Sequence, residues 1–125
     1  MPKVTVDAGL FFSHMQHEPM TTEELDQLLA DYGLELEKDY VEDGVSKIKI
    51  EALANRPDLL CAENIGLALR VFLGGQLPEF KVTPPQVKIT VDDSVIGIRP
   101  YFVSAVLRNI HFTPESYESF IDYQD

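Results

Sequence analysis

The sequence predicts an α+β fold in which a small three-helix module with a β-hairpin is followed by the first strands and helix of a second α+β module. Three patterns predict it: a helix with clear start and stop signals, an alternating hairpin directly after it, and a long apolar helix behind the hairpin. A proline-rich stretch at residues 77–86 separates residues 1–76 from residues 87–125. We therefore expect a module, a linker and the start of another module.

A short strand and two helices open the first module. Alternating valines within residues 3–7 indicate a strand, and Asp7 is placed to cap a helix over residues 8–15. A second helix starts at Thr21, which stands three residues before Glu24, as in a capping box. The apolar stripe of this helix and the glycine that favours its left-handed end are Leu25, Leu28, Leu29, Tyr32 and Gly33.

A β-hairpin follows across residues 34–51. Leu34 and Leu36 alternate with glutamates, and the return strand alternates isoleucines with lysines. Between the two strands, Glu42, Asp43 and Gly44 form a turn signal. The order helix, hairpin, helix is thus predicted for this module.

The stretch ALANRPDLLCAENIGLALRVFLGG, residues 52–75, joins the hairpin to the next helix. Pro57 suits the start of a helix, and Asp58 can accept hydrogen bonds from the free amides there. Asn55 is an alternative cap one turn earlier. From Leu59 onward, apolar side chains cover most of the helix circumference, which predicts a helix buried on several sides.

The chain turns from the hairpin to this apolar helix through four residues that we call the polar corner: Asn55, Arg56, Pro57 and Asp58. Charged side chains are rarely buried without a partner. We therefore predict a structural or interface motif that locks the hairpin to the long helix. In this motif Asp58 caps the helix, and Arg56 bonds to nearby carbonyls or to a carboxylate.

The second module begins with residues 87–91, whose alternation predicts a strand. Residues 101–110 are apolar enough for a strand that is buried on both faces, and Thr113-Pro114 opens a helix. That helix reaches Asp125 without a glycine or another stop signal. We therefore expect that the chain is cut inside a helix and that this second module is truncated.

Composition and charge exclude several classes of protein. The formal net charge is −11 and no cluster of lysines and arginines is present, which argues against a free-standing DNA- or RNA-binding domain. No apolar run approaches the ~20 residues of a membrane span, and no signal sequence precedes the first strand. A single cysteine allows no internal disulfide. We expect a soluble, cytoplasmic protein without a membrane partner.

Few residues are candidates for chemistry. His14 and His17 can share one helix face, but a zinc site needs three or four ligands and no further ligand stands at suitable spacing. Cys61 lies in an apolar helix, where a free cysteine usually acts as a small hydrophobe. The glycine pair at 74–75 lacks the further glycines of a phosphate-binding loop. We therefore assign no catalytic, cofactor-binding or metal residue.

Three segments carry a family resemblance. They are TTEELDQLLADYGLELE, ANRPDLLCAENIGLALRVF and IRPYFVSAVLRNIHFTPESYESFIDYQD, in this order. Together they resemble the amino-terminal part of the β subunit of phenylalanyl-tRNA synthetase, of the archaeal and eukaryotic type. The insertion typical of bacterial β subunits, which follows the segment matching LELE, is absent from this sequence.

The resemblance implies a subunit of an enzyme rather than a complete enzyme. It implies a winged-helix-like first module and, after the linker, the start of the module that edits mischarged tRNA. The family's editing residues are expected beyond Asp125. The implied holoenzyme is an α2β2 heterotetramer that attaches phenylalanine to its tRNA with ATP and magnesium at a site in the α subunit. The implied partners are therefore the α subunit and, through the holoenzyme, tRNA(Phe), with no DNA.

Alternative functions stay open at this point. Arg56 can contact tRNA or another module instead of serving only the corner. The chain as a whole can be a stand-alone scaffold or a nucleic-acid-binding protein that derives from the same module but lacks the catalytic parts.

Overall fold

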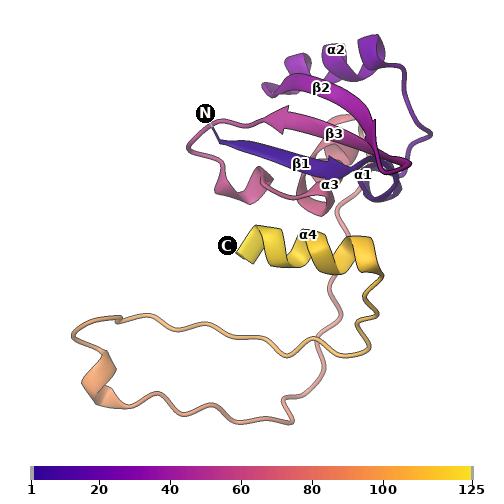
Figure 1. Cartoon of the computed structure of the whole chain (residues 1–125). Coiled ribbons are helices and arrows are strands. Elements are labelled where there is room, and N and C mark those ends of the chain that lie inside the picture. The colour runs from indigo at the N-terminus through magenta and orange to yellow at the C-terminus, as the bar shows by residue number, and fades with distance from the viewer. Residues whose placement is uncertain (1, 125) are drawn as a thin grey trace. The chain divides into compact units, whose positions relative to one another are not determined.

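The computed structural model describes residues 2–124, which fall into two compact units: Met1–Leu77 with Phe112–Asp125, and Pro78–His111. In chain order the elements (Figure 1) are β1 (Lys3–Asp7), α1 (Ala8–Met15), α2 (Thr22–Tyr32), β2 (Glu35–Glu42), β3 (Val45–Glu51), the 3-10 turn η1 (Pro57–Leu59), α3 (Ala62–Phe72), the 3-10 turn η2 (Asp93–Val95) and α4 (Pro114–Gln124).

A three-stranded antiparallel sheet forms the centre of the first unit, with β3 between β1 and β2 (Figure 1). The predicted hairpin is confirmed, and its turn places Asp43 and Gly44 at φ 50° and 79°. Two successive left-handed residues match the right-handed twist of the flanking strands. The strand predicted at residues 3–7 is also present, as β1. The structure adds that β1 pairs with β3 and forms one edge of the sheet.

Two predicted helix caps are present. The Asp7 carboxylate accepts a hydrogen bond from the Leu10 amide at 2.8 Å, which fixes the start of α1 directly after β1. At the start of α2, the Thr21 amide donates to Glu24 Oε2 at 2.9 Å and the Glu24 amide donates to Thr21 Oγ1 at 3.3 Å. This reciprocal pair is the capping box that the spacing predicts. Gly33 ends the helix with φ 100°.

One hydrophobic core joins the inner face of the sheet to the helices. Helix α1 contacts β1, β3 and α3, whereas α2 contacts β2. No buried residue in the described part of the chain is polar or charged. The core members are Val6, Phe11, Phe12, Met15, Leu25, Leu28, Leu29, Leu34, Ile48, Ile50, Ala52, Leu59, Ala62, Ile65 and Leu69.

Helices α1 and α3 approach each other most closely at Gly66. A Cβ atom added there would lie 2.8 Å from the Phe11 carbonyl oxygen and 3.0 Å from the Met15 nitrogen. Both are backbone atoms of α1, so they cannot move aside as a flexible side chain would. Glycine at this position therefore sets the distance between the two helices.

The outer face of the sheet carries paired charges. Lys3 lies 3.0 Å from Glu37 and 3.7 Å from Glu51, and Lys49 lies 3.3 Å from Glu37. The hydrogen bond with Lys3 lowers the pKa of Glu37 below its ordinary value. This face is therefore a solvated network of opposite charges and not a free basic surface.

The second unit corrects two predictions. Residues 87–91 and 101–110, which we expected as strands, form no ladder, and η2 is the single helical turn among residues 78–111. Strands form ladders only by exchanging backbone hydrogen bonds with a neighbouring strand. The alternation of residues 87–91 and the apolar run of residues 101–110 favour strands, but no partner strand for them lies within residues 2–124. Outside this unit, the predicted helix after Thr113 is present as α4.

Replacing Gly66 with alanine tests the contact between α1 and α3. We expect Gly66→Ala to lower the free energy of unfolding by about 1–2 kcal/mol, because overpacking outweighs the gain in helix propensity. Urea denaturation measures the change. Gly97→Ala is the matched control, since a Cβ there meets no atom within 4 Å. Equal stability of both variants would show that the helices are not in close contact.

Acidification tests the capping box. The hydrogen bonds from Thr21 lower the pKa of Glu24 below its ordinary value of 4.5, so its stabilising contribution is present above that pH and is lost as the pH falls. We expect Glu24→Gln to flatten the decline of the thermal midpoint below about pH 4.5. Glu23→Gln, on the exposed neighbour, is the control. Identical pH profiles for the two variants would contradict the assignment.

Candidate interaction site

The corner between β3 and α3 is built from tight local hydrogen bonds. The Ala52 amide donates to the Pro2 carbonyl at 2.9 Å, so β3 remains attached to the edge strand up to its end. The Arg56 amide then donates to the Leu53 carbonyl at 3.0 Å, and the Leu59 amide to the Arg56 carbonyl at 3.1 Å. These two bonds close successive turns that redirect the chain from the sheet to α3.

Arg56 and Asp58 form a bidentate ion pair within this corner. Arg56 Nε lies 2.9 Å from Asp58 Oδ1, and Arg56 Nη2 lies 2.8 Å from Asp58 Oδ2. The pair raises the pKa of Arg56 and lowers the pKa of Asp58, each through the side-chain hydrogen bond with the other. The predicted bond from Arg56 to a nearby carboxylate is therefore present.

The predicted helix cap at Asp58 is wrong. Pro57 opens the separate turn η1, and α3 begins only at Ala62, with Cys61 in the N-cap position and no side-chain cap. The Asp58 carboxylate therefore lies one turn too early to reach the free amides of α3. Asn64 makes the link instead, because its Nδ2 donates to the Asp58 carbonyl at 2.8 Å.

The premise that the corner is buried is also wrong. Arg56 is only partly covered, and Asp58 and Asn55 are exposed. The Asn55 side chain makes no hydrogen bond to any of the residues that the structure describes, so it caps neither turn. Whether the corner serves as an interface remains a prediction.

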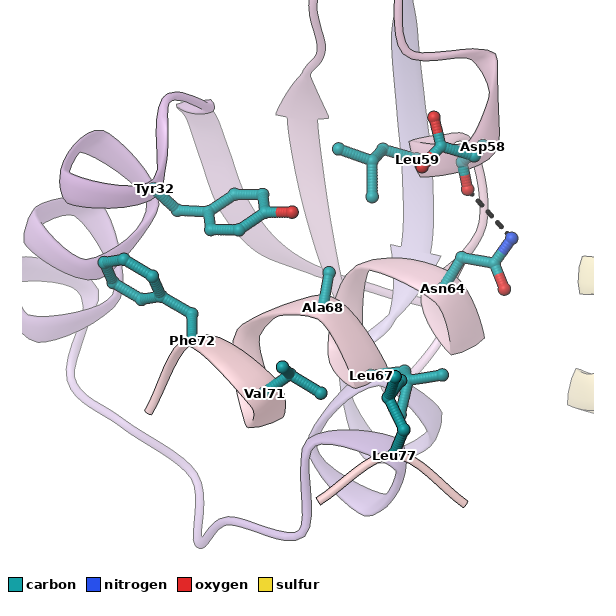
Figure 2. Close-up of a pocket in the computed structure, with 9 residues that line it drawn as sticks. All are labelled: Tyr32, Asp58, Leu59, Asn64, Leu67, Ala68, Val71, Phe72 and Leu77. Carbon is teal, nitrogen blue, oxygen red and sulfur yellow. Dashed lines mark hydrogen bonds between the residues drawn. The ribbon is translucent and has the colours of Figure 1, made fainter. Parts of the chain in front are cut away.

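Next to the corner, a groove of about 430 Å³ runs along α3 (Figure 2). Figure 2 shows the Tyr32 ring from α2 facing the Phe72 ring from α3, with Leu67 and Leu77 also among the lining residues. The two rings pack edge to face with centroids 5.4 Å apart. The groove is lined by Tyr32, Asp58, Leu59, Asn64, Leu67, Ala68, Val71, Phe72 and Leu77.

Most of these groove residues belong to the helix that the sequence pattern predicts to be buried on several sides. The structure buries one face of α3, formed by Ala62, Ile65, Gly66 and Leu69. Phe72 is 50% exposed and Leu77 is 66% exposed. The sequence signal for this groove is that α3 has more apolar positions than one buried face requires.

The remaining candidates for chemistry are dispersed. Helix α1 ends at Met15, so His17 lies outside it and bonds through Nδ1 with the Glu18 carbonyl at 2.7 Å. Burial raises the pKa of the Cys61 thiol, as expected for a small hydrophobe. Within residues 2–124, no three His, Cys, Asp or Glu side chains converge on a point that could hold a metal ion. No helix there is both long and apolar enough to cross a bilayer.

Fold and groove together define a small α+β module with an apolar groove along the open side of one helix. Residues 1–75 match the family model described as the Phe-tRNA synthetase beta subunit B1 domain. Because this match covers more than half of the sequence, the chain belongs to the phenylalanyl-tRNA synthetase β-subunit family. The resemblance noted in the sequence is thereby confirmed.

Individual relatives agree with this assignment. The chain is 36% identical to the phenylalanine–tRNA ligase beta subunit of Saccharomyces cerevisiae and 37% identical to that of Homo sapiens; the whole chain is matched in both cases. It resembles the crystal structure of an N-terminal fragment of the phenylalanyl-tRNA synthetase beta-subunit from Pyrococcus horikoshii, with a TM-score of 0.83 and 28% identity. That match covers 98% of this chain and 36% of the solved one.

The chain spans only part of these relatives. It corresponds to 22% of the yeast subunit and to 24% of the human subunit. Roughly three quarters of a typical family member therefore lies outside the sequence described by this structure.

Replacing Asp58 tests the corrected role of the corner. We expect Asp58→Asn to leave the thermal midpoint almost unchanged, because an exposed ion pair contributes little and the side chain caps no helix. Thr21→Ala is the positive control, since losing that cap lowers stability by ~1 kcal/mol. A loss for Asp58→Asn as large as that of Thr21→Ala would restore the capping role.

Proposed function

We propose that this chain is an amino-terminal structural and docking part of the β subunit of phenylalanine–tRNA ligase. In this proposal it works within an α2β2 heterotetramer in the cytoplasm, which attaches phenylalanine to tRNA(Phe) in an ATP-dependent reaction and edits mischarged tRNA. The observation that carries the proposal is the family match over residues 1–75, supported by relatives that match the entire chain.

The proposal assigns no catalytic step to residues 2–124. The described residues offer no converging set of carboxylates or histidines for Mg²⁺. The glycine pair at the end of α3 is not preceded by a strand, as a phosphate-binding loop requires. In this proposal ATP and Mg²⁺ belong to the α subunit, as the family resemblance implies, and the chain contributes packing, positioning and tethering.

Residues 87–125 are proposed to begin the editing module. Their support is the alternation of residues 87–91 and the apolar run of residues 101–110, neither of which forms a ladder within the described part of the chain. Such segments can complete a sheet when further strands are supplied. The short stretch before them, residues 77–86, then serves as the linker.

The alternative is a scaffold or nucleic-acid-binding protein that derives from the same module. Its nucleic-acid form is disfavoured by the net charge of −11 and by the pairing of Lys3 and Lys49 with glutamates on the sheet. A scaffold protein would have the same fold but would not associate with a synthetase α subunit.

A chimeric subunit distinguishes these functions. The matched first part of the yeast β subunit is replaced by this chain, and the product is co-expressed with the yeast α subunit. We expect the chimera to restore the α2β2 assembly and phenylalanine charging, measured by mass photometry and by aminoacylation of tRNA(Phe). A yeast subunit that lacks the matched part is the control, and a chimera that performs no better than this truncation would overturn the proposal.

A further inference from the structure

The open side of α3 carries more apolar surface than the module uses. Val71 and Phe72 are 37% and 50% exposed, and Leu77, beyond the helix end, is 66% exposed. Removing large apolar side chains from water stabilises a protein, so covering these side chains would add to stability. A helix that is apolar on both sides is typical of a helix that is covered on both sides.

The groove on this side is shaped rather than flat. Tyr32 and Phe72 pack against each other at one end, and Leu67 and Leu77 also line the groove (Figure 2). Its polar rim is already satisfied, because Asp58 is paired with Arg56 and the Asp58 carbonyl accepts from Asn64. An occupant therefore needs no charge to meet the rim and gains most from large aliphatic or aromatic side chains.

The size of the groove favours an occupant from the same polypeptide. A stable complex between separate proteins usually buries roughly 1,200–2,000 Å², which is more than one side of an eleven-residue helix offers. A tethered segment needs less area, because its effective concentration is in the millimolar range for a short flexible connection. Family members supply such segments, since this chain corresponds to only 22–24% of the yeast and human subunits.

We propose that the groove along α3 is the docking site for an apolar segment of the same β subunit. The segment comes from the part of the subunit that follows the region corresponding to this chain. This inference rests on the proposed function, because it requires that the chain works within a full-length subunit. The segment seats its large apolar side chains between Phe72 and Leu77 and covers the open side of α3. Docking thereby fixes the first module against the rest of the subunit.

Hydroxyl-radical footprinting tests the docking directly. The isolated 125-residue chain and the chimeric yeast subunit, purified without the α subunit, are oxidised and analysed by mass spectrometry. We expect the oxidation rates of Phe72 and Leu77 to fall several-fold in the chimera relative to the isolated chain. Val41, 68% exposed on the hairpin, is the internal control and keeps its rate.

A variant pair gives a second readout. We expect Leu77→Asp to leave the unfolding midpoint of the isolated chain unchanged, because Leu77 is mostly exposed there, and to lower the midpoint of the chimeric subunit. Val41→Asp is the matched control and leaves both midpoints unchanged. The same small effect of Leu77→Asp in both proteins would overturn the proposal.

Three other footprinting outcomes would also overturn it. Unchanged oxidation in the chimera would mean that nothing covers the groove. Protection that appears only after the α subunit is added would make that subunit the occupant. Protection in the isolated chain that grows with its concentration would make a second copy the occupant. Failure of the proposed function would appear as lost assembly or lost charging of tRNA(Phe). Neither quantity is measured in the footprinting or unfolding experiments, so the two failures can be told apart.

Discussion

The structure depends on the close approach of α1 and α3 at Gly66. The helix that follows the first strand and the helix that follows the hairpin are far apart in the sequence, and their contact closes the core behind the sheet. With no side chain at this position, the backbone atoms of Phe11 and Met15 lie directly against α3. The buried residues Ile65 and Leu69 can then reach the core from one face of α3, and its other face is left open.

Local chemistry made much of the first unit predictable. The Asp7 cap, the capping box at Thr21, the glycine end at Gly33 and the turn at Asp43-Gly44 each depend on residues only a few positions apart. Such signals are complete within the sequence window in which they are found. The pairing of β1 with β3 depends on residues far apart in the sequence, and no local pattern contains that information.

Three predictions failed for reasons that lie beyond local pattern. Asp58 was a plausible cap by type and position, but the turn η1 separates it from α3 and the nearby guanidinium of Arg56 takes its carboxylate. Residues 87–91 have the alternation of a strand and residues 101–110 the apolar content of one, but neither pairs with a strand in the described part of the chain. The apolar circumference of α3 predicted burial on several sides, whereas one side is buried. In the last two cases the sequence indicates neighbours that the described residues do not supply.

The unpaired segments and the open side of α3 both concern how the module is anchored in a larger subunit. Its charged sheet face is satisfied internally by Lys3, Glu37 and Lys49, and its polar corner is satisfied by the pair of Arg56 with Asp58. Polar surface that is already paired gains little from a partner, because its existing hydrogen bonds would have to be replaced. Exposed apolar surface gains from any cover that excludes water. Within the first unit, the open side of α3 is therefore a surface where anchoring to a larger subunit yields free energy.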